Sequence, residues 1–194
     1  MADNMKTVDM VIVGVGGQGT LLASKILGQL AISEGCGVKV SEVHGMSQRG
    51  GSVITHVRMG ADVHSPLVSE GAADFLISFE ALEAARAAAF LKPDGIAIVN
   101  AQRILPMPVI TGAATYPENP LSVFPEGHVM AIDALALAME AGSPRAVNLV
   151  LLGLLSTRLP FSTDAWQAAI TACVPAKTLA TNLDAFAKGR ACAQ

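Results

Sequence analysis

Short apolar runs and amphipathic stretches alternate through the first part of the chain. Residues 8–13 (VDMVIV) form an apolar run of the kind found in buried strands. Residues 20–33 then place leucine and isoleucine at helical spacing, and the glycines that follow end this predicted helix. Residues 38–43 predict a second strand. This order of strand, loop, helix and strand favours a parallel pair joined by a right-handed crossover.

The remainder of the chain predicts more strands and then mostly helices. Strands are expected at 51–59, 74–79, 95–99 and 129–132, with a helix over 81–91 and a turn at 92–94. Residues 102–127 are expected to be irregular or to contain only short strands. Further helices are expected after residue 132, from the Ser143-Pro144 start to 157, after the Ser162-Thr163 cap, and over 177–188. The pattern indicates a single α/β domain over residues 1–194. Its fold is a Rossmann-like, doubly wound, mostly parallel sheet with C-terminal helices packed on it.

The composition predicts a large aliphatic core and a surface that a partner subunit covers. Hydrophobic residues make up 52% of the chain, charged residues 15% and aromatic residues only 4%. Such a chain buries a large core of aliphatic side chains. The high apolar content also indicates that a partner subunit covers part of the surface. The net charge of −3 argues against a nucleic-acid partner, which usually needs a basic face.

Cysteine usage and hydropathy argue against a metal centre and a membrane span. The three cysteines are widely separated and form no CxxC pair, so no iron–sulfur or zinc site is expected from this chain alone. The longest apolar run, residues 147–155, is far shorter than the roughly 20 residues that cross a bilayer. The N-terminal residues contain no secretory apolar segment. We therefore expect a soluble, cytoplasmic protein with reduced thiols.

A glycine loop follows the first predicted strand and opens the first predicted helix. Gly14, Gly16 and Gly19 match the GxGxxG pattern, with Gly17 and Gln18 between them. Glycines at these positions permit a tight turn, close approach of a phosphate and close helix–strand packing. The first amides of the helix also favour an anion. The five residues are candidates for binding a nucleotide-type cofactor, and the alternative is a tight turn that holds no ligand.

A second glycine-rich loop occupies residues 41–52 (SEVHGMSQRGGS). A doubly wound sheet places it at the carboxyl end of the second predicted strand, near the first glycine loop. Arg49 lies among small residues, where its guanidinium can present a fork to a phosphate or carboxylate. The alternative is a structural Arg49 that pairs with Glu42 or with a partner chain. His44 is the candidate catalytic residue of this loop, either as an acid–base group or as a substrate contact. The candidate cofactor-binding residues in and beside this loop are Ser41, Glu42, Gln48, Arg49, Gly50 and Gly51.

Three polar positions beyond the loops leave alternatives open. Glu42 lies about 20 residues after the glycine loop, where an acid can bind the ribose of NAD. Asn100 ends a predicted strand and either binds the ligand or closes a turn. Glu80 begins a predicted helix, where a carboxylate usually stabilises the N-terminus, with a role in the site as the lesser option.

The two loops together resemble the gamma-type domain of the 2-oxoacid:acceptor oxidoreductase family, in particular the beta subunit of indolepyruvate:ferredoxin oxidoreductases. Shorter matches extend the resemblance over nearly the whole chain. They are Ser65-Pro66-Leu67, residues 79–84 (FEALEA), Asn100, Asn148, Leu152-Gly153, Asn182, Ala185-Phe186 and Gly189.

The resemblance implies a subunit that is inactive alone. Enzymes of this family oxidatively decarboxylate a 2-oxoacid such as an arylpyruvate with coenzyme A and pass the electrons to ferredoxin. Thiamine diphosphate and the iron–sulfur clusters belong to the large partner subunit, and the gamma-type domain lies over the active site. The residues leave two other functions open: an independent NAD(P)-binding dehydrogenase that uses Glu42, and a scaffold whose glycine loop is empty.

Overall fold

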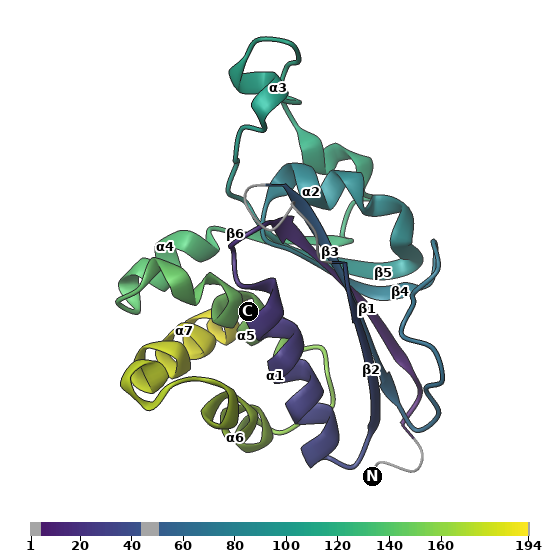
Figure 1. The fold of residues 1–194 in the computed structure, drawn as a ribbon, viewed down its shortest axis with the longest axis vertical. Helices are drawn as coiled ribbons and strands as arrows, with labels where there is room; N and C mark the ends of the chain where they lie inside the picture. Colours follow the sequence, from purple (N-terminus) through teal and green to yellow (C-terminus); the bar gives the residue numbers. More distant parts are fainter. Residues whose placement is uncertain (1–4, 44–50, 194) are drawn as a thin grey trace.

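The computed structural model describes residues 5–43 and 51–193, which form one six-stranded sheet with helices on both faces (Figure 1). The strands are β1 (Val8–Val15), β2 (Gly37–Glu42), β3 (Ser52–Gly60), β4 (Ala73–Ser78), β5 (Leu91–Asn100) and β6 (Val129–Ile132). The α-helices are α1 (Thr20–Ser33), α2 (Ala81–Arg86), α3 (Met107–Ile110), α4 (Ala134–Glu140), α5 (Val147–Ser156), α6 (Thr163–Cys173) and α7 (Leu179–Ala191). Short 3₁₀ turns are η3 (Ala88–Phe90), η4 (Pro120–Val123), η5 (Pro144–Ala146) and η6 (Ala176–Thr178).

The sheet has the order β2-β3-β1-β4-β5-β6, and β3 is its antiparallel strand. β1, β4, β5 and β6 pair parallel to one another, which confirms the predicted mostly parallel α/β sheet. The predicted neighbouring pair of β1 and β2 is wrong, because β3 pairs with β1 along its whole length and separates the two strands. The polar Lys39 and Ser41 alternate with valines in β2, and this alternation suits a half-exposed edge strand.

Two apolar cores lie on opposite faces of the sheet. The central strand β1 sends Met10 and Ile12 into one core and Val11 and Val13 into the other. The larger core is covered by α1, α4, α5, α6 and α7, and the smaller one by α2 and its neighbouring turns (Figure 1). Every residue of α5 is buried, which explains why its sequence is apolar all round. The fold is thus doubly wound, with the predicted C-terminal helices on one face.

The stretch 81–100 differs from the prediction in its boundaries. The predicted helix over 81–91 ends at Arg86, and β5 begins at Leu91 after a 3₁₀ turn. The predicted turn at 92–94 is wrong, since these residues belong to β5. The register of β4 against β5 shifts between Ala73 and Phe75, so the extra residues of β5 are accommodated as an irregularity within the sheet.

The C-terminal helices pack through two glycines. A Cβ atom on Gly153 of α5 would lie 2.1 Å from the carbonyl oxygen of Phe186 in α7. A Cβ atom on Gly189 would lie 2.0 Å from the carbonyl oxygen of Val150. Both contacts are with backbone, which cannot swing aside as a side chain can. The two helices can therefore approach this closely only where both positions lack a side chain.

Gly153→Ala tests this close crossing. The added methyl group must push α5 and α7 apart, so we expect a loss of about 3 kcal/mol in the free energy of unfolding, at the upper end of overpacking effects. The matched control is Gly28→Ala in α1, where a Cβ atom would meet nothing within 4 Å. It should gain about 0.5–1 kcal/mol from its higher helix propensity. Urea denaturation measures both, and equal effects of the two substitutions would contradict the account.

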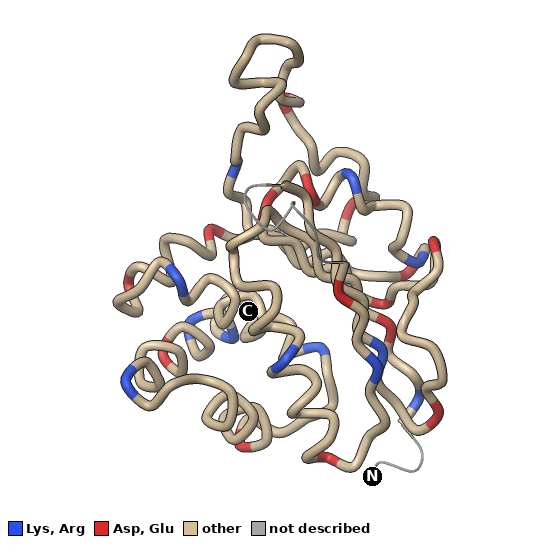
Figure 2. The backbone as a smooth tube through the Cα atoms, in the orientation of Figure 1, with Lys and Arg blue, Asp and Glu red and all other residues tan. Residues whose placement is uncertain are grey.

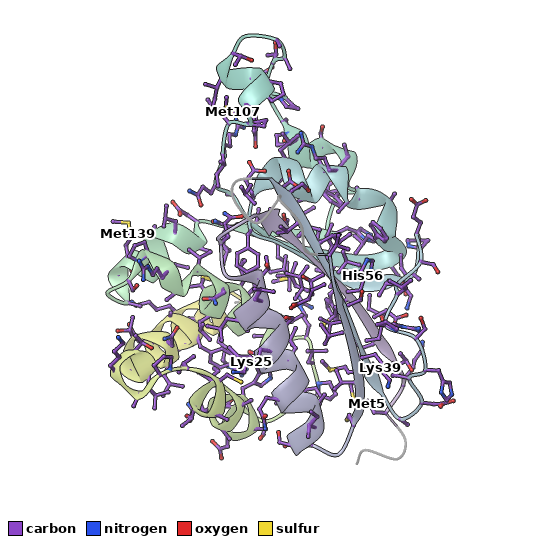
Figure 3. All side chains as sticks on the ribbon, in the orientation of Figure 1. Met5, Lys25, Lys39, His56, Met107 and Met139 are labelled. Atoms are coloured by element: carbon purple, nitrogen blue, oxygen red, sulfur yellow. The ribbon has the colours of Figure 1, made fainter. Side chains whose placement is uncertain are left out.

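His56 of β3 is a buried polar residue beneath the smaller core (Figure 3). Its Nδ1 accepts a hydrogen bond from the Val68 amide at 3.3 Å, and its ring meets Phe90 edge-on. Burial lowers the pKa of His56 below its ordinary value of 6.5. His56 is thus a polar residue on a covered face of β3.

Acidification should destabilise the protein through His56. The unfolded chain binds a proton at this ring below about pH 6.5, whereas the folded ring stays neutral, so stability falls as the pH drops through that value. His56→Gln should show a smaller loss of stability between pH 7.5 and 5.5 than the wild type. His64→Gln, at the exposed pair with Asp62, is the control and should keep the wild-type loss. Urea midpoints at the two pH values distinguish these outcomes.

Candidate functional site

The glycine loop connects β1 to α1 in a conformation that needs glycine. Gly17 and Gly19 have φ angles of 99° and 91°, in the left-handed region where a side chain is strained. Gly19 is the N-cap of α1, and its carbonyl oxygen accepts a bond from Asn148 Nδ2 at 3.4 Å. A Cβ atom on Gly19 would lie 3.1 Å from that same nitrogen. The third glycine of the motif thus lets α1 approach α5.

Gln18 holds the loop from within. Its Oε1 accepts a hydrogen bond from the Val15 amide at 2.7 Å, and its Nε2 donates to the carbonyl oxygen of Phe79 at 3.1 Å. A Cβ atom on Gly14 would lie 2.8 Å from Gln18 Oε1, so the first glycine makes room for this side chain. Gln18, predicted as a cofactor-binding residue, therefore has both polar atoms engaged with the protein.

Asn100 joins the same network at the end of β5. Its Nδ2 donates to the carbonyl oxygen of Phe79 at 3.1 Å, and its Oδ1 accepts from the Ala134 amide at 3.1 Å. The side chain is fully buried. Of the two roles that the sequence left open, these contacts favour the closing of a turn, because both polar atoms of the amide are bonded to the backbone.

The second glycine loop meets the first at Gly51. The Gly16 amide donates a hydrogen bond of 2.8 Å to the Gly51 carbonyl oxygen, immediately before β3 begins. The prediction that the two loops lie together is supported by this contact. The other candidates of the second loop lie outside the described residues. They are His44, Gln48, Arg49 and Gly50.

Ser41 and Glu42 lie on β2, the edge strand. Glu42 Oε1 accepts a hydrogen bond of 2.5 Å from Ser24 Oγ of α1, which engages the carboxylate that the NAD hypothesis requires. Ser41 pairs with His56 across the strands. β3 lies between β2 and β1, so Glu42 is one strand farther from the glycine loop than the predicted parallel pair would place it.

Cavities open on two sides of the glycine loop. The first has a volume of about 310 Å³ and is lined by the loop with the hydroxyl-bearing Thr20 and Thr55. The second, of about 440 Å³, is lined by the loop with Gln102, Arg145 and Asn148. Gly17 and Gly19 line both cavities. A ligand on either side therefore contacts backbone that carries no side chain.

The electrostatics of this region suit an anion. The first amides of α1 have no earlier turn of helix to bond, and the helix dipole adds partial positive charge there. The first turn of α1 contains no acidic residue. Arg145 in η5 adds a full positive charge to the second cavity. Sequence reasoning missed Arg145, although its place just after the Ser143-Pro144 helix start could have indicated it.

Glu80 and Glu83 follow β4 at the same edge of the sheet. Glu80 is the N-cap of α2 and accepts a bond from the Glu83 amide at 2.9 Å, as predicted for a carboxylate at a helix start. Glu83 binds Arg86 at 2.6 Å and also accepts a bond from the hydroxyl of Ser52. Both carboxylates thus hold backbone and neighbouring side chains in place.

Within residues 5–43 and 51–193, no group of three histidine, cysteine or acidic side chains is placed to hold a metal ion. The same residues include no helix with the length and apolar character needed to span a membrane.

Comparison with known proteins gives the class. The family model described as pyruvate ferredoxin/flavodoxin oxidoreductase matches residues 9–192. The chain therefore belongs to this family of oxidoreductases, which confirms the resemblance of the two glycine loops. The family match gives no support to the two alternative functions, an independent NAD(P)-binding dehydrogenase and a scaffold.

Relatives narrow the class further. The chain is 46% identical to the indolepyruvate oxidoreductase subunit IorB of Thermococcus kodakarensis, over 95% of both chains. In fold it is similar to the gamma subunit of a keto/oxoacid ferredoxin oxidoreductase from Geobacter sulfurreducens, with a TM-score of 0.75, 23% identity and 97% coverage of both chains. It is also similar to 31% of a longer chain of the 2-oxoglutarate:ferredoxin oxidoreductase from Magnetococcus marinus, with 97% of this chain covered, a TM-score of 0.72 and 22% identity. That structure holds 2-oxoglutarate, coenzyme A and succinyl-CoA.

Asn100→Ala tests the network around the glycine loop. The substitution leaves the buried Ala134 amide without its acceptor, so we expect a loss of about 2–3 kcal/mol in the free energy of unfolding. Asn119→Ala is the control, because the Asn119 side chain caps no amide of η4 and is exposed. It should change stability by less than about 0.5 kcal/mol. A wild-type denaturation midpoint for Asn100→Ala would show that the network contributes nothing.

Proposed function

We propose that this chain is the small subunit of an arylpyruvate:ferredoxin oxidoreductase, with indolepyruvate as the representative substrate. The complex decarboxylates the 2-oxoacid, joins the acyl group to coenzyme A and passes the electrons to ferredoxin. The identity of 46% to an indolepyruvate oxidoreductase subunit over nearly the whole chain supports the substrate class. We expect the chain to be inactive alone and to work in the cytoplasm.

The cofactors are divided between the subunits in this proposal. Thiamine diphosphate and the iron–sulfur clusters belong to the large subunit, and coenzyme A is the shared substrate. The residues of this chain bind and orient coenzyme A. The start of α1 and the glycine loop face a phosphate of coenzyme A, with Arg145 and Arg49 as cations beside it. His44 is the proposed acid–base group of the second loop.

The observation that carries the proposal is the glycine loop between two cavities. Gly17 and Gly19 expose backbone to both cavities, and the loop begins a helix whose first turn carries no acid. A large phosphate ester needs such uncrowded backbone, because a glycine has no side chain to keep the anion away from the backbone amides. The Magnetococcus marinus enzyme, one chain of which contains this fold, is a 2-oxoglutarate:ferredoxin oxidoreductase with coenzyme A bound, and this supports looking for a coenzyme A contact here.

Calorimetry of the assembled complex with coenzyme A tests the proposal. Arg145→Ala and Arg49→Ala should each weaken the affinity roughly fivefold, equivalent to about 1 kcal/mol for one charged contact with a phosphate. The control is Arg158→Ala. Arg158 is exposed, as Arg145 is, and lines a cavity beside the first residues of β1, away from the glycine loop. Unchanged affinity in both loop-side variants would overturn the assignment of the coenzyme A site to this chain.

A further inference from the structure

A slender arm, residues 105–115, projects from the edge of the sheet where the glycine loop lies (Figure 1). It contains the single helical turn α3 and returns to the body before η4. Residues 111–115 are all exposed. Three apolar side chains of the arm are exposed as well, with Leu105 at 50%, Met107 at 66% and Ile110 at 62%. The sequence predicted irregular structure or only short strands here, whereas the structure forms the helical turn α3.

The arm carries no charge. No Lys, Arg, Asp, Glu or His occurs from residue 104 to residue 117, although charged residues make up 15% of the chain. The tip of the projection is tan in Figure 2, without the blue or red of charged residues, and Arg103 and Glu118 flank the uncharged segment in the sequence. An exposed segment that is apolar and uncharged has the composition of an interface core, in which charges are depleted and methionine is enriched. Such a surface contributes favourable free energy only when another apolar surface covers it.

The base of the arm is fastened to the body by a buried carboxylate. Glu80 is 1% exposed, and its Oε1 accepts bonds from the Ile104 amide at 3.0 Å and the Tyr116 hydroxyl at 2.6 Å. Burial and the neighbouring Glu80 raise the pKa of Tyr116 above its ordinary value, so the hydroxyl remains a donor. Arg103 lies over the Tyr116 ring and donates to the Glu118 carbonyl oxygen at 2.7 Å. The two ends of the arm are therefore held where the chain leaves the body of the protein and where it returns.

The arm itself is stiffened by its sequence. Pro106 and Pro108 restrict the chain at α3, and the Ala114 amide bonds back to the Pro108 carbonyl oxygen at 3.0 Å. A surface element that is already ordered loses less conformational entropy when a partner covers it. The arm is thus built for docking at little entropic cost.

The location of the arm indicates what covers it. A cavity of about 560 Å³ lies between the arm base and the junction of the two glycine loops, and it is lined by Gly51, Ser52, Leu105 and Met107 among others. A subunit that completes an active site over the glycine loop must lie over this same edge. Its surface would therefore meet the arm.

We propose that the arm docks in an apolar surface of the large subunit, with Met107 and Ile110 as its anchors. The inference rests on the proposed function, because that function supplies the large subunit. Glu80 acts as a positioning residue for the arm through Tyr116 and Ile104.

The test compares two double variants in binding to the purified large subunit by calorimetry. Met107→Ser with Ile110→Ser should weaken the binding at least about tenfold, as expected when interface anchors are truncated. The control is Ile32→Ser with Met139→Ser, whose side chains are 63% and 62% exposed on α1 and α4 (Figure 3 shows Met107 and Met139). The control should bind within about twofold of the wild type. Thermal unfolding of each variant alone should match the wild type, because all four side chains are exposed.

A third variant addresses the fastening of the arm. Tyr116→Phe removes the hydroxyl that donates to Glu80 and keeps the ring beneath Arg103. It should weaken binding to the large subunit by a smaller factor than the anchor variant and mainly slow association, because the arm must then be ordered during docking. Equal association rates for Tyr116→Phe and wild type would overturn the positioning role of Glu80.

The remaining outcomes separate the inference from the function. If the wild type fails to bind the large subunit, that result contradicts both the proposed function and the inference about the arm. If the wild type binds and the anchor variant binds equally well, only the inference falls. Equal losses in the anchor and control variants would also overturn it. Self-association of the isolated chain that the anchor variant abolishes would assign the arm to a second copy instead.

Discussion

The carbonyl oxygen of Phe79 accepts hydrogen bonds from two side-chain amides, and the glycine loop depends on this junction. Gln18 approaches it from the loop and Asn100 from the end of β5. The same two side chains also bind the amides of Val15 and Ala134. One carbonyl group thus joins the loop, β4, β5 and the start of α4. These hydrogen bonds hold the loop that leads into α1, so in the proposed function a phosphate of coenzyme A meets amides that are already ordered.

The residue after Phe79 extends the junction to the arm. Glu80 caps α2 and binds both ends of the arm at its base. The glycine loop and the projecting arm are therefore fixed from neighbouring positions of one chain segment. In the proposed complex, a subunit that binds the arm is positioned relative to the glycine loop by these few contacts, which gives a physical reason for locating an interface and a shared active site in the same part of the molecule.

Much of the fold could be predicted because local patterns determine it. The apolar run at 8–13 and the helical spacing at 20–33 gave β1 and α1, and the serine caps gave the starts of η5 and α6. The strand order could not be predicted, because the insertion of β3 between β1 and β2 depends on which strand has two buried faces. For the site, the meeting of the loops was foreseen, whereas the contacts of Gln18 and of Glu80 join residues up to 61 positions apart and leave no local pattern.

Reconstitution of turnover measures the central claim most directly, namely that this chain supplies a wall of an active site completed by a larger subunit. The reduction of ferredoxin would be followed with indolepyruvate and coenzyme A, using this chain alone, the large subunit alone and the two mixed. The account predicts ferredoxin reduction and acyl-coenzyme A formation only in the mixture, saturating at a fixed ratio of the subunits. Equal turnover by the large subunit alone, or NAD-dependent turnover by this chain alone, would contradict it.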